Sequence, residues 1–368
     1  MKQRIATQVV HAGREDLCSL GVHVTPIDLS STYPTPDPDA AAASLEAFVD
    51  GAENAVNPVY ARLHNPTVAR FERALASLEG ADQAVAFGSG MAALTAVLLA
   101  LGDQGRHVIA VRPLYGGTDH LLATGLLGTE VSFVDADAVA QAIRPDTALI
   151  VIETPANPTV QLVDIEAIVR QAGTLPVLVD STFATPILQR PLDHGAAMVL
   201  HSATKFLGGH GDVVAGVVAC GAEFAGKLRQ VRILTGAILH PLAAFLLLRG
   251  LSTLRLRVLA AQENAQQLAS RLARHPQIAK VHYPGLGSPQ QNAIVNRQME
   301  GPGSVLAFEM HSGAEADQML RALKLITPAV SLGSVDSLIQ RPAALTHRIV
   351  DPQARSAHGI SDGLLRMS

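Results

Sequence analysis

The sequence predicts an α/β protein built on a doubly wound, mostly parallel sheet. From about residue 82, short β-branched apolar runs alternate with longer segments of helical pattern, and each run ends at a turn signal. This alternation is typical of parallel strands joined by helices. The runs are apolar at nearly every position, which indicates strands that helices cover on both faces.

The elements follow in a simple order. Prolines in "TPIDLSSTYPTPDPDAAAA" predict an irregular N-terminal arm, because proline prevents long regular elements. Strands are expected at residues 83–87, 107–111, 130–134, 148–153, 175–180 and 197–202. A long helix is then expected to about residue 274, followed by a strand at 303–310 and a helix at 313–325. The predicted parts are an arm (1–57), a large domain (58–240) and a small α/β domain (241–368).

Composition excludes several classes of function. The 368 residues allow a large core and two domains. A net charge of −4 without a basic run argues against nucleic-acid partners and against an anionic membrane surface, which leaves small molecules. The N-terminus lacks the apolar core of a signal peptide. Cys18 and Cys220 fit neither a disulfide framework nor a metal site, so we expect a reducing, cytoplasmic location.

Polar and glycine-rich segments follow five of the predicted strands at their carboxyl ends, where open parallel sheets bind ligands. One of them, "LHSATKFLGGHGD", contains Lys205. An ammonium at the end of a buried strand must be paired, exposed or lowered in pKa, and a lowered pKa makes the amine a nucleophile. A surface lysine on a loop is the alternative.

Three further groups at these strand ends suit one ligand. The N–H groups of Gly90 and Met91 would open a helix toward an anion such as a phosphate, unless "GSGMAAL" is only a turn capped by Ser89. Asp180 needs a cationic or hydrogen-bonding partner, either a protonated pyridine nitrogen or its own loop. Tyr115, followed by two glycines, could stack on a flat ligand or simply pack. Together with Lys205, these groups suit pyridoxal 5'-phosphate.

Eight motifs, in order and in spacing, closely resemble the Cys/Met metabolism family of PLP-dependent enzymes, the fold-type I trans-sulfuration group. They are "YARLHNPT", "FGSGMAAL", "RPLYGGT", "ETPANPT", "VDSTFATP", "HSATKFLGGHGD", "SLGSVDSL" and "GISDGLLRMS". The resemblance covers nearly the whole chain. It implies the aspartate aminotransferase-like fold, with pyridoxal 5'-phosphate as the cofactor.

The resemblance also implies a role for each matching residue. Lys205 would form the Schiff base, Asp180 would face the pyridine nitrogen and Tyr115 would stack on the ring. The other implied residues are Gly90, Met91, Ser202 and Thr204 at the phosphate, Tyr60 and Arg62 at the phosphate of a neighbouring subunit, Asn157 and Thr182 beside the ring, and Ser331 and Arg366 at the substrate carboxylate. Members of this group are tetramers built from active dimers, which gives the proline-rich arm a purpose between subunits.

The implied reaction is γ-elimination on cystathionine or a related sulfur amino acid. Methionine-specialised members tend to carry cysteine where this chain has Gly117, and "LTGAILHP" and "SLGSVDSLIQ" resemble the lyases more than the synthases. Many cystathionine lyases have glutamate in place of Asp336. The alternatives are γ-replacement on O-acylhomoserine, a methionine γ-lyase and a cystathionine β-lyase.

Two readings come from other classes of protein. The chain ends at Ser368, in what resembles the strand of Arg366, without the usual final helix. The small domain is therefore expected to be truncated, and a protein that binds the cofactor but catalyses weakly is one alternative. A nicotinamide-dependent α/β enzyme is the other, and it lacks the G-x-G-x-x-G signature after the first strand.

Overall fold

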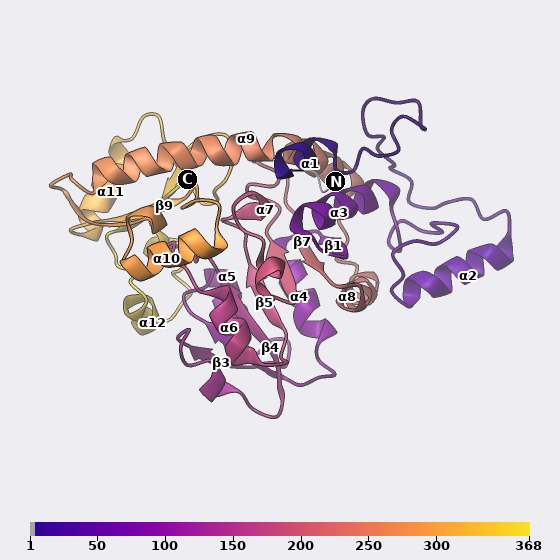
Figure 1. Ribbon diagram of the computed structural model, residues 1–368, viewed down its shortest axis with the longest axis horizontal. Helices are drawn as coiled ribbons and strands as arrows, with labels where there is room; N and C mark the ends of the chain where they lie inside the picture. The colour runs from indigo at the N-terminus through magenta and orange to yellow at the C-terminus, as the bar shows by residue number, and fades with distance from the viewer. Residues whose placement is uncertain (1–3) are drawn as a thin grey trace.

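The computed structural model describes residues 4–368 and shows two sheets joined by one long helix (Figure 1). Within that range the helices are α1 (Ile5–His11), α2 (Pro38–Val49), α3 (Pro66–Glu79), α4 (Gly90–Ala100), α5 (Gly116–Thr124), α6 (Ile165–Ala172), α7 (Thr185–Leu188), α8 (Ala222–Thr235), α9 (Pro241–Leu272), α10 (Pro289–Gln298), α11 (Gly313–Ala322) and α12 (Pro352–Ala357). No helix among these is long and apolar enough to cross a bilayer.

The larger sheet has the order β1-β7-β6-β5-β4-β2-β3 among the described residues. Its strands are β1 (Gln83–Phe87), β2 (His107–Val111), β3 (Glu130–Val134), β4 (Thr147–Glu153), β5 (Val177–Asp180), β6 (Met198–His201) and β7 (Gly216–Cys220). β7 pairs antiparallel with both β1 and β6, whereas the other neighbouring pairs of this sheet are parallel. The six strands predicted before residue 203 are all present, whereas β7 was missed, although its run "GVVAC" is as short and as apolar as those of β1 and β2.

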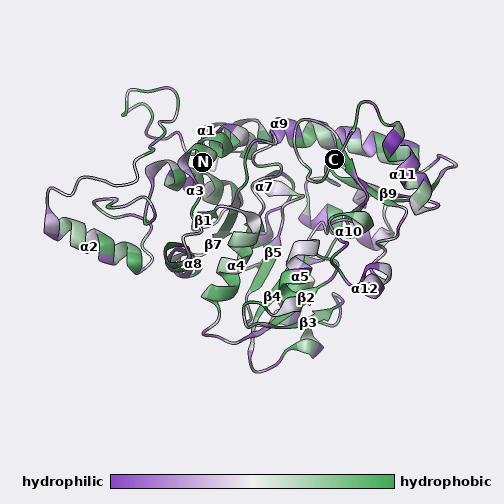
Figure 2. Ribbon diagram, turned by 180° about the vertical axis from the view of Figure 1, so that it is seen from behind, coloured by the Kyte–Doolittle hydropathy of each residue, from purple (hydrophilic) through white to green (hydrophobic). Residues whose placement is uncertain are grey.

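Helices cover both faces of this sheet, as the continuous apolar runs predicted. Figure 2 shows hydrophobic strands at the centre of the molecule. Ala84 and Ala86 of β1 pack with α3 and α9, whereas Val85 and Phe87 pack with α4 and α8 on the opposite face. Because side chains alternate along a strand, a run that is buried on both faces must be apolar at every position.

The smaller sheet has the order β10-β11-β12-β9-β8, with β8 (Ile278–His282), β9 (Leu306–Met310), β10 (Thr327–Pro328), β11 (Leu338–Gln340) and β12 (Leu364–Met367). Helix α9 belongs to both halves, since Leu247 and Leu251 lie in the core of the larger sheet and Ala265 and Ala269 in that of the smaller. Strand β12 is paired on both sides, which holds Arg366 in the interior.

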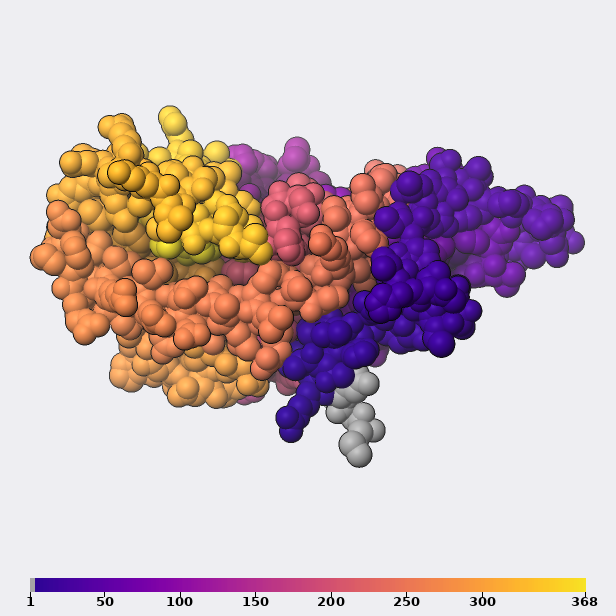
Figure 3. Space-filling model, turned by 90° about the horizontal axis from the view of Figure 1, so that it is seen from above, coloured from indigo at the N-terminus to yellow at the C-terminus, as the bar shows by residue number. Residues whose placement is uncertain are grey.

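The N-terminal arm contains more helix than its prolines suggested. Helix α2 extends away from the body of the molecule (Figures 1 and 3). It begins at Pro38, and the Asp37 carboxylate accepts hydrogen bonds from the N–H groups of Asp39 and Ala40. Proline is favourable at the first position of a helix, where its missing N–H has no partner to lose, so Pro38 starts this helix rather than preventing it.

Candidate active site

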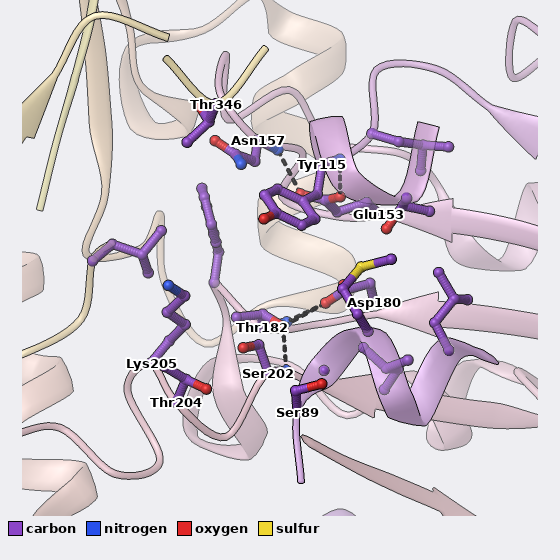
Figure 4. A pocket seen from close by; sticks show the side chains of 18 of the residues that line it. Ser89, Tyr115, Glu153, Asn157, Asp180, Thr182, Ser202, Thr204, Lys205 and Thr346 are labelled. Atoms are coloured by element: carbon purple, nitrogen blue, oxygen red, sulfur yellow. Dashed lines mark hydrogen bonds between the residues drawn. The ribbon is translucent and has the colours of Figure 1, made fainter. Parts of the chain in front are cut away.

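A cavity of about 560 Å³ opens at the carboxyl ends of the parallel strands of the larger sheet and reaches β12 of the smaller one (Figure 4). Its size is that of a site for a small ligand. Of the thirteen residues that the sequence assigned to the site, eleven line it: Gly90, Met91, Tyr115, Asn157, Asp180, Thr182, Ser202, Thr204, Lys205, Ser331 and Arg366. Segments far apart in the sequence therefore converge here.

Lys205 is partly buried and lies in the loop after β6. Its Nζ donates a hydrogen bond of 2.8 Å to Oγ of Ser331. Burial, with a smaller contribution from the positive charge of Arg366, lowers the pKa of Lys205 to about 8. The amine is therefore far closer to its free, nucleophilic form at neutral pH than a surface lysine would be.

Ser331 belongs to the half of the molecule that contains the smaller sheet, and it contacts Lys205 while its backbone adopts an unusual conformation. Its φ of +88° lies in a region that residues other than glycine seldom adopt. The Ser331 carbonyl accepts a hydrogen bond from Arg366 while its hydroxyl meets Lys205. Two contacts to site residues thus hold the strained conformation in place.

Asp180 ends β5 and is held by the residue two positions later. Its Oδ1 accepts hydrogen bonds from the backbone N–H of Thr182 at 3.0 Å and from the Thr182 hydroxyl. Burial nevertheless raises the pKa of Asp180. A cation placed against this carboxylate, such as a protonated ring nitrogen, would favour its ionised form, so the site suits a pyridinium.

The amino end of α4 forms the floor of the cavity. Ser89 caps this helix, since its Oγ accepts a hydrogen bond of 3.0 Å from the N–H of Ala92. A β-carbon at Gly90 would lie 3.1 Å from Cβ of Ser202, so this glycine lets the two segments approach. The helix end, together with the Ser202 hydroxyl in the loop after β6, suits an anion such as phosphate.

Thr204 has a contact that the sequence did not suggest. Its Oγ1 donates a hydrogen bond of 3.1 Å to the carbonyl of Ala215 and accepts one of 3.0 Å from the N–H of the same residue. The hydroxyl therefore ties the Lys205 loop to the segment before β7, in addition to lining the cavity.

Tyr115 lies just before α5, with its ring in the cavity. The ring packs over Gly117, where a β-carbon would lie only 2.6 Å from Cε1 of the tyrosine. The backbone N–H of Tyr115 donates a hydrogen bond of 2.6 Å to Oε2 of Glu153. The side chain is 39% exposed, which leaves a ring face free to stack on a planar ligand.

Glu153 is a site residue that the sequence analysis missed. It ends β4, lines the cavity and accepts a second hydrogen bond, of 2.7 Å, from the N–H of Asn157. Burial and the nearby charge of Asp180 raise the pKa of Glu153 well above its ordinary value. The signal was available, because Glu153 is a carboxylate at the carboxyl end of a buried parallel strand, as Asp180 is.

Arg366 completes the cavity from β12. Its Nη1 donates a hydrogen bond of 3.0 Å to Oδ1 of Asn157, and burial lowers its pKa to about 10. The pKa stays high enough for the guanidinium to remain charged at neutral pH. A buried cation beside Lys205 and Asn157 is suited to bind a carboxylate in two-point contact.

Tyr60 and Arg62 lie outside the cavity of this chain. Nη1 of Arg62 donates a hydrogen bond of 2.7 Å to the carbonyl of Ile233, and the guanidinium carbon lies 5.6 Å from the centre of the Tyr60 ring. Tyr60 is 44% exposed. This placement is compatible with the predicted role toward a neighbouring subunit, which stays a prediction.

Comparison with known proteins identifies the family. The profile described as "Cys/Met metabolism PLP-dependent enzyme" matches residues 6–368. The chain is 59% identical to the L-methionine gamma-lyase of Streptomyces avermitilis, over 98% of this chain and 84% of that protein. It is 52% identical to the L-methionine gamma-lyase of Brevibacterium sandarakinum, over 98% and 92%.

Solved structures agree. The cystathionine gamma-lyase of Lactobacillus plantarum, complexed with L-serine, superposes with a TM-score of 0.90 at 35% identity, over 100% of this chain and 94% of that one. The cystathionine gamma synthase of Xanthomonas oryzae pv. oryzae superposes with a TM-score of 0.90 at 35% identity, over 100% of this chain and 93% of that one. The predicted fold type I and the predicted class, a PLP-dependent carbon–sulfur lyase, are confirmed.

The described residues also fit the cofactor on chemical grounds. Around one cavity they place the Lys205 amine with its lowered pKa, a carboxylate that can contact a ring nitrogen and an aromatic ring that can stack on a planar ligand. The amino end of α4 and a nearby hydroxyl lie at the same cavity. The chain therefore belongs to the Cys/Met metabolism family of PLP-dependent enzymes.

Proposed function

We propose that the chain catalyses γ-elimination of L-methionine, in which methionine and water give methanethiol, 2-oxobutanoate and ammonia. The names of the relatives at 59% and 52% identity support this substrate. The apolar part of the cavity lining is the main structural support. Leu114, Val330 and Leu345 line the cavity together with the hydroxyl-bearing Thr118 and Thr346. An apolar wall suits a thioether methyl group and offers no charge to a zwitterionic side chain.

In this proposal, each charged side chain that lines the cavity has a role other than binding the distal end of the substrate. They are Glu153, Asp180, Lys205 and Arg366. Asp180 holds the ring nitrogen, Arg366 binds the substrate carboxylate and Glu153 contacts backbone N–H groups. Among the described residues that line the cavity, no further charged group remains for the distal end of a substrate.

Bound pyridoxal 5'-phosphate would withdraw electrons from Cα of the amino acid. The Lys205 amine would remove a proton from Cα and one from Cβ of the substrate. The Tyr115 hydroxyl would accept the proton of the substrate ammonium or protonate the departing thiolate. Arg366 would fix which Cα bond stands perpendicular to the ring.

Cystathionine is the second candidate substrate, and it was the first expectation from the sequence. Gly117 favours it, because cysteine is typical of methionine-specialised members at this position. Against it, Asp336, the position at which many cystathionine lyases carry glutamate, is exposed and does not line the cavity. The distal ammonium of cystathionine would therefore lack a carboxylate partner from this position.

A product assay distinguishes the candidates. We expect methionine to yield 2-oxobutanoate and methanethiol in equal amounts, with a larger kcat/KM than cystathionine. A larger kcat/KM for cystathionine, with release of cysteine and 2-oxobutanoate, would reverse the assignment. Pyruvate and homocysteine from cystathionine would indicate β-elimination instead, and thioether formation from cysteine and an O-acylhomoserine would indicate γ-replacement.

We further propose a homotetramer of active dimers in the cytoplasm. Exposed aliphatic side chains, among them Leu20, Val24 and Leu29, concentrate on the N-terminal arm. An apolar surface of this kind is typical of an interface between subunits. The two cysteines are unpaired within this chain, which suits a reducing compartment.

A further inference from the structure

Two side chains hydrogen-bond to one peptide group beside the cavity, one at its N–H and the other at its carbonyl. The Leu114–Tyr115 peptide donates its N–H to Oε2 of Glu153 at 2.6 Å and accepts a hydrogen bond from Nε2 of His347 at its carbonyl, at 3.3 Å. In a trans peptide the N–H and the C=O point in opposite directions, so the two side chains approach this unit from opposite sides. Tyr115 follows immediately.

The two contacts come from different halves of the molecule. Glu153 ends β4 of the larger sheet, whereas His347 follows the 3₁₀ turn at Pro342–Ala344, which is connected to the smaller sheet. Both side chains are buried. Glu153 also holds the N–H of Asn157, so one carboxylate joins the Tyr115 segment to the Asn157 segment.

The chemistry of His347 suits this contact. A carbonyl can only accept, so Nε2 must carry the proton, and Nδ1 can then accept from the Thr346 hydroxyl at 3.0 Å. Burial lowers the pKa of His347 to about 4, which keeps the ring neutral at neutral pH. Next to it, a β-carbon at Gly116 would lie 2.2 Å from the carbonyl oxygen of Thr346, so the two segments pack without a gap.

We propose that Glu153 and His347 are positioning residues that hold the Leu114–Tyr115 peptide between them and thereby fix the Tyr115 ring over the cofactor. They act through Tyr115 rather than on the substrate. The proposal rests on the pyridoxal phosphate site and is independent of the choice between methionine and cystathionine.

Four variants of the holoenzyme test the proposal. Glu153→Gln keeps the shape but leaves one of the two N–H groups facing an NH₂, and His347→Leu removes the donor. His347→Gln restores a donor and should rescue in part. His107→Leu is the control, since His107 is a buried histidine at the other end of β2 that contacts only Thr147 and Ser132 through its ring.

The first readout is the visible circular dichroism of the bound cofactor, recorded without substrate. We expect Glu153→Gln and His347→Leu to change its intensity, and His107→Leu to leave it unchanged even if that variant is less stable. An unchanged signal in both positioning variants would overturn the proposal. Because no turnover is involved, this readout is independent of the proposed reaction.

The second readout is a double-mutant cycle on kcat. We expect Glu153→Gln to lower kcat by about tenfold or more, the equivalent of about one lost buried hydrogen bond. In a Tyr115→Ala background, which lacks the ring to be positioned, the same change should lower kcat by less than about twofold. An equal loss in both backgrounds would show that Glu153 does not act through Tyr115.

Discussion

Lys205 illustrates how one side chain obtains its reactivity from its surroundings. Burial near Arg366 lowers its pKa from 10.5 to about 8. At pH 7 about a tenth of the amine would then be free, compared with roughly three parts in ten thousand for an unperturbed lysine. The difference is a large gain in the population of the nucleophile.

The first prediction is a pH dependence of cofactor capture. Because only the free amine attacks the aldehyde, the rate at which apoenzyme incorporates pyridoxal 5'-phosphate should rise about tenfold per pH unit below pH 8 and level off above it. Stopped-flow absorbance measures this rate, and borohydride reduction followed by peptide mapping should place the pyridoxyl group on Lys205. A plateau first reached near pH 10.5, or a label on another lysine, would contradict the assignment.

The second prediction concerns Arg366. Lysine at this position keeps the charge but lacks the planar guanidinium, which can donate two parallel hydrogen bonds to a carboxylate. Arg366→Lys should therefore reduce the stabilisation of the transition state by about 2 to 5 kcal/mol. We expect kcat/KM for methionine to fall by a factor of about 30 or more. The absorbance of the bound cofactor should persist, which separates loss of substrate binding from loss of the cofactor. A fall of less than threefold would argue against a carboxylate clamp.

At the scale of an element, the amino end of α4 combines a structural cap with a site for an anion. Ser89 satisfies the N–H of Ala92, while Gly90 and Met91 at the start of the helix line the cavity. One face of α4, with Ala93, Leu94 and Val97, is buried against the sheet and fixes the position of this helix end. The same helix end therefore serves stability and binding.

The third prediction separates these two functions. Ser89→Ala should lower the free energy of unfolding by about 1 kcal/mol, because it removes the cap, whereas Ser89→Gly should cost only a few tenths. Urea denaturation of the apoenzyme measures both. If the two variants are equally destabilised, the loss arises from packing and not from the cap.

Close packing against the start of α4 also explains the glycine at the start of β7. Gly216, at the start of β7, lies so near the α4 loop that a β-carbon would be 2.2 Å from the carbonyl oxygen of Ser89. A side chain at Gly216 would therefore push the antiparallel strand away from the helix end. This packing explains why a glycine begins a strand that is otherwise apolar and buried.

At the scale of the whole molecule, the site depends on both sheets. Lys205, Asp180 and Tyr115 come from the larger sheet, and Ser331 and Arg366 from the smaller. Helix α9 is one element that links them, because it packs in the cores of both. Movement of one sheet relative to the other would alter the distance from Arg366 to Lys205.

The fourth prediction tests whether a neighbouring subunit completes the site. Tyr60 and Arg62 line no part of the cavity in their own chain. Chains that carry Arg62→Ala, mixed with chains that carry Lys205→Ala, should therefore form some hybrid sites with both residues intact and regain activity. Subunit exchange, verified with two differently tagged chains, is the control. Verified exchange without any recovered activity would show that Arg62 does not act across an interface.

Sequence alone determined the parts of this protein that depend on local pattern. The six strands from β1 to β6 were predicted because two-sided burial demands continuous apolar runs, and ligand-binding segments at strand ends follow from parallel topology. These rules gathered Lys205, Asp180 and Tyr115 into one predicted site. Residues with a role in the resembled family were predicted from their motifs.

Tertiary structure decided what has no local signal. Glu153 and His347 lie 194 positions apart in the sequence, by their residue numbers, and only folding brings both of them to the Leu114–Tyr115 peptide. The lowered pKa of Lys205 likewise required burial beside Arg366, because desolvation is a property of the packed molecule and not of any segment.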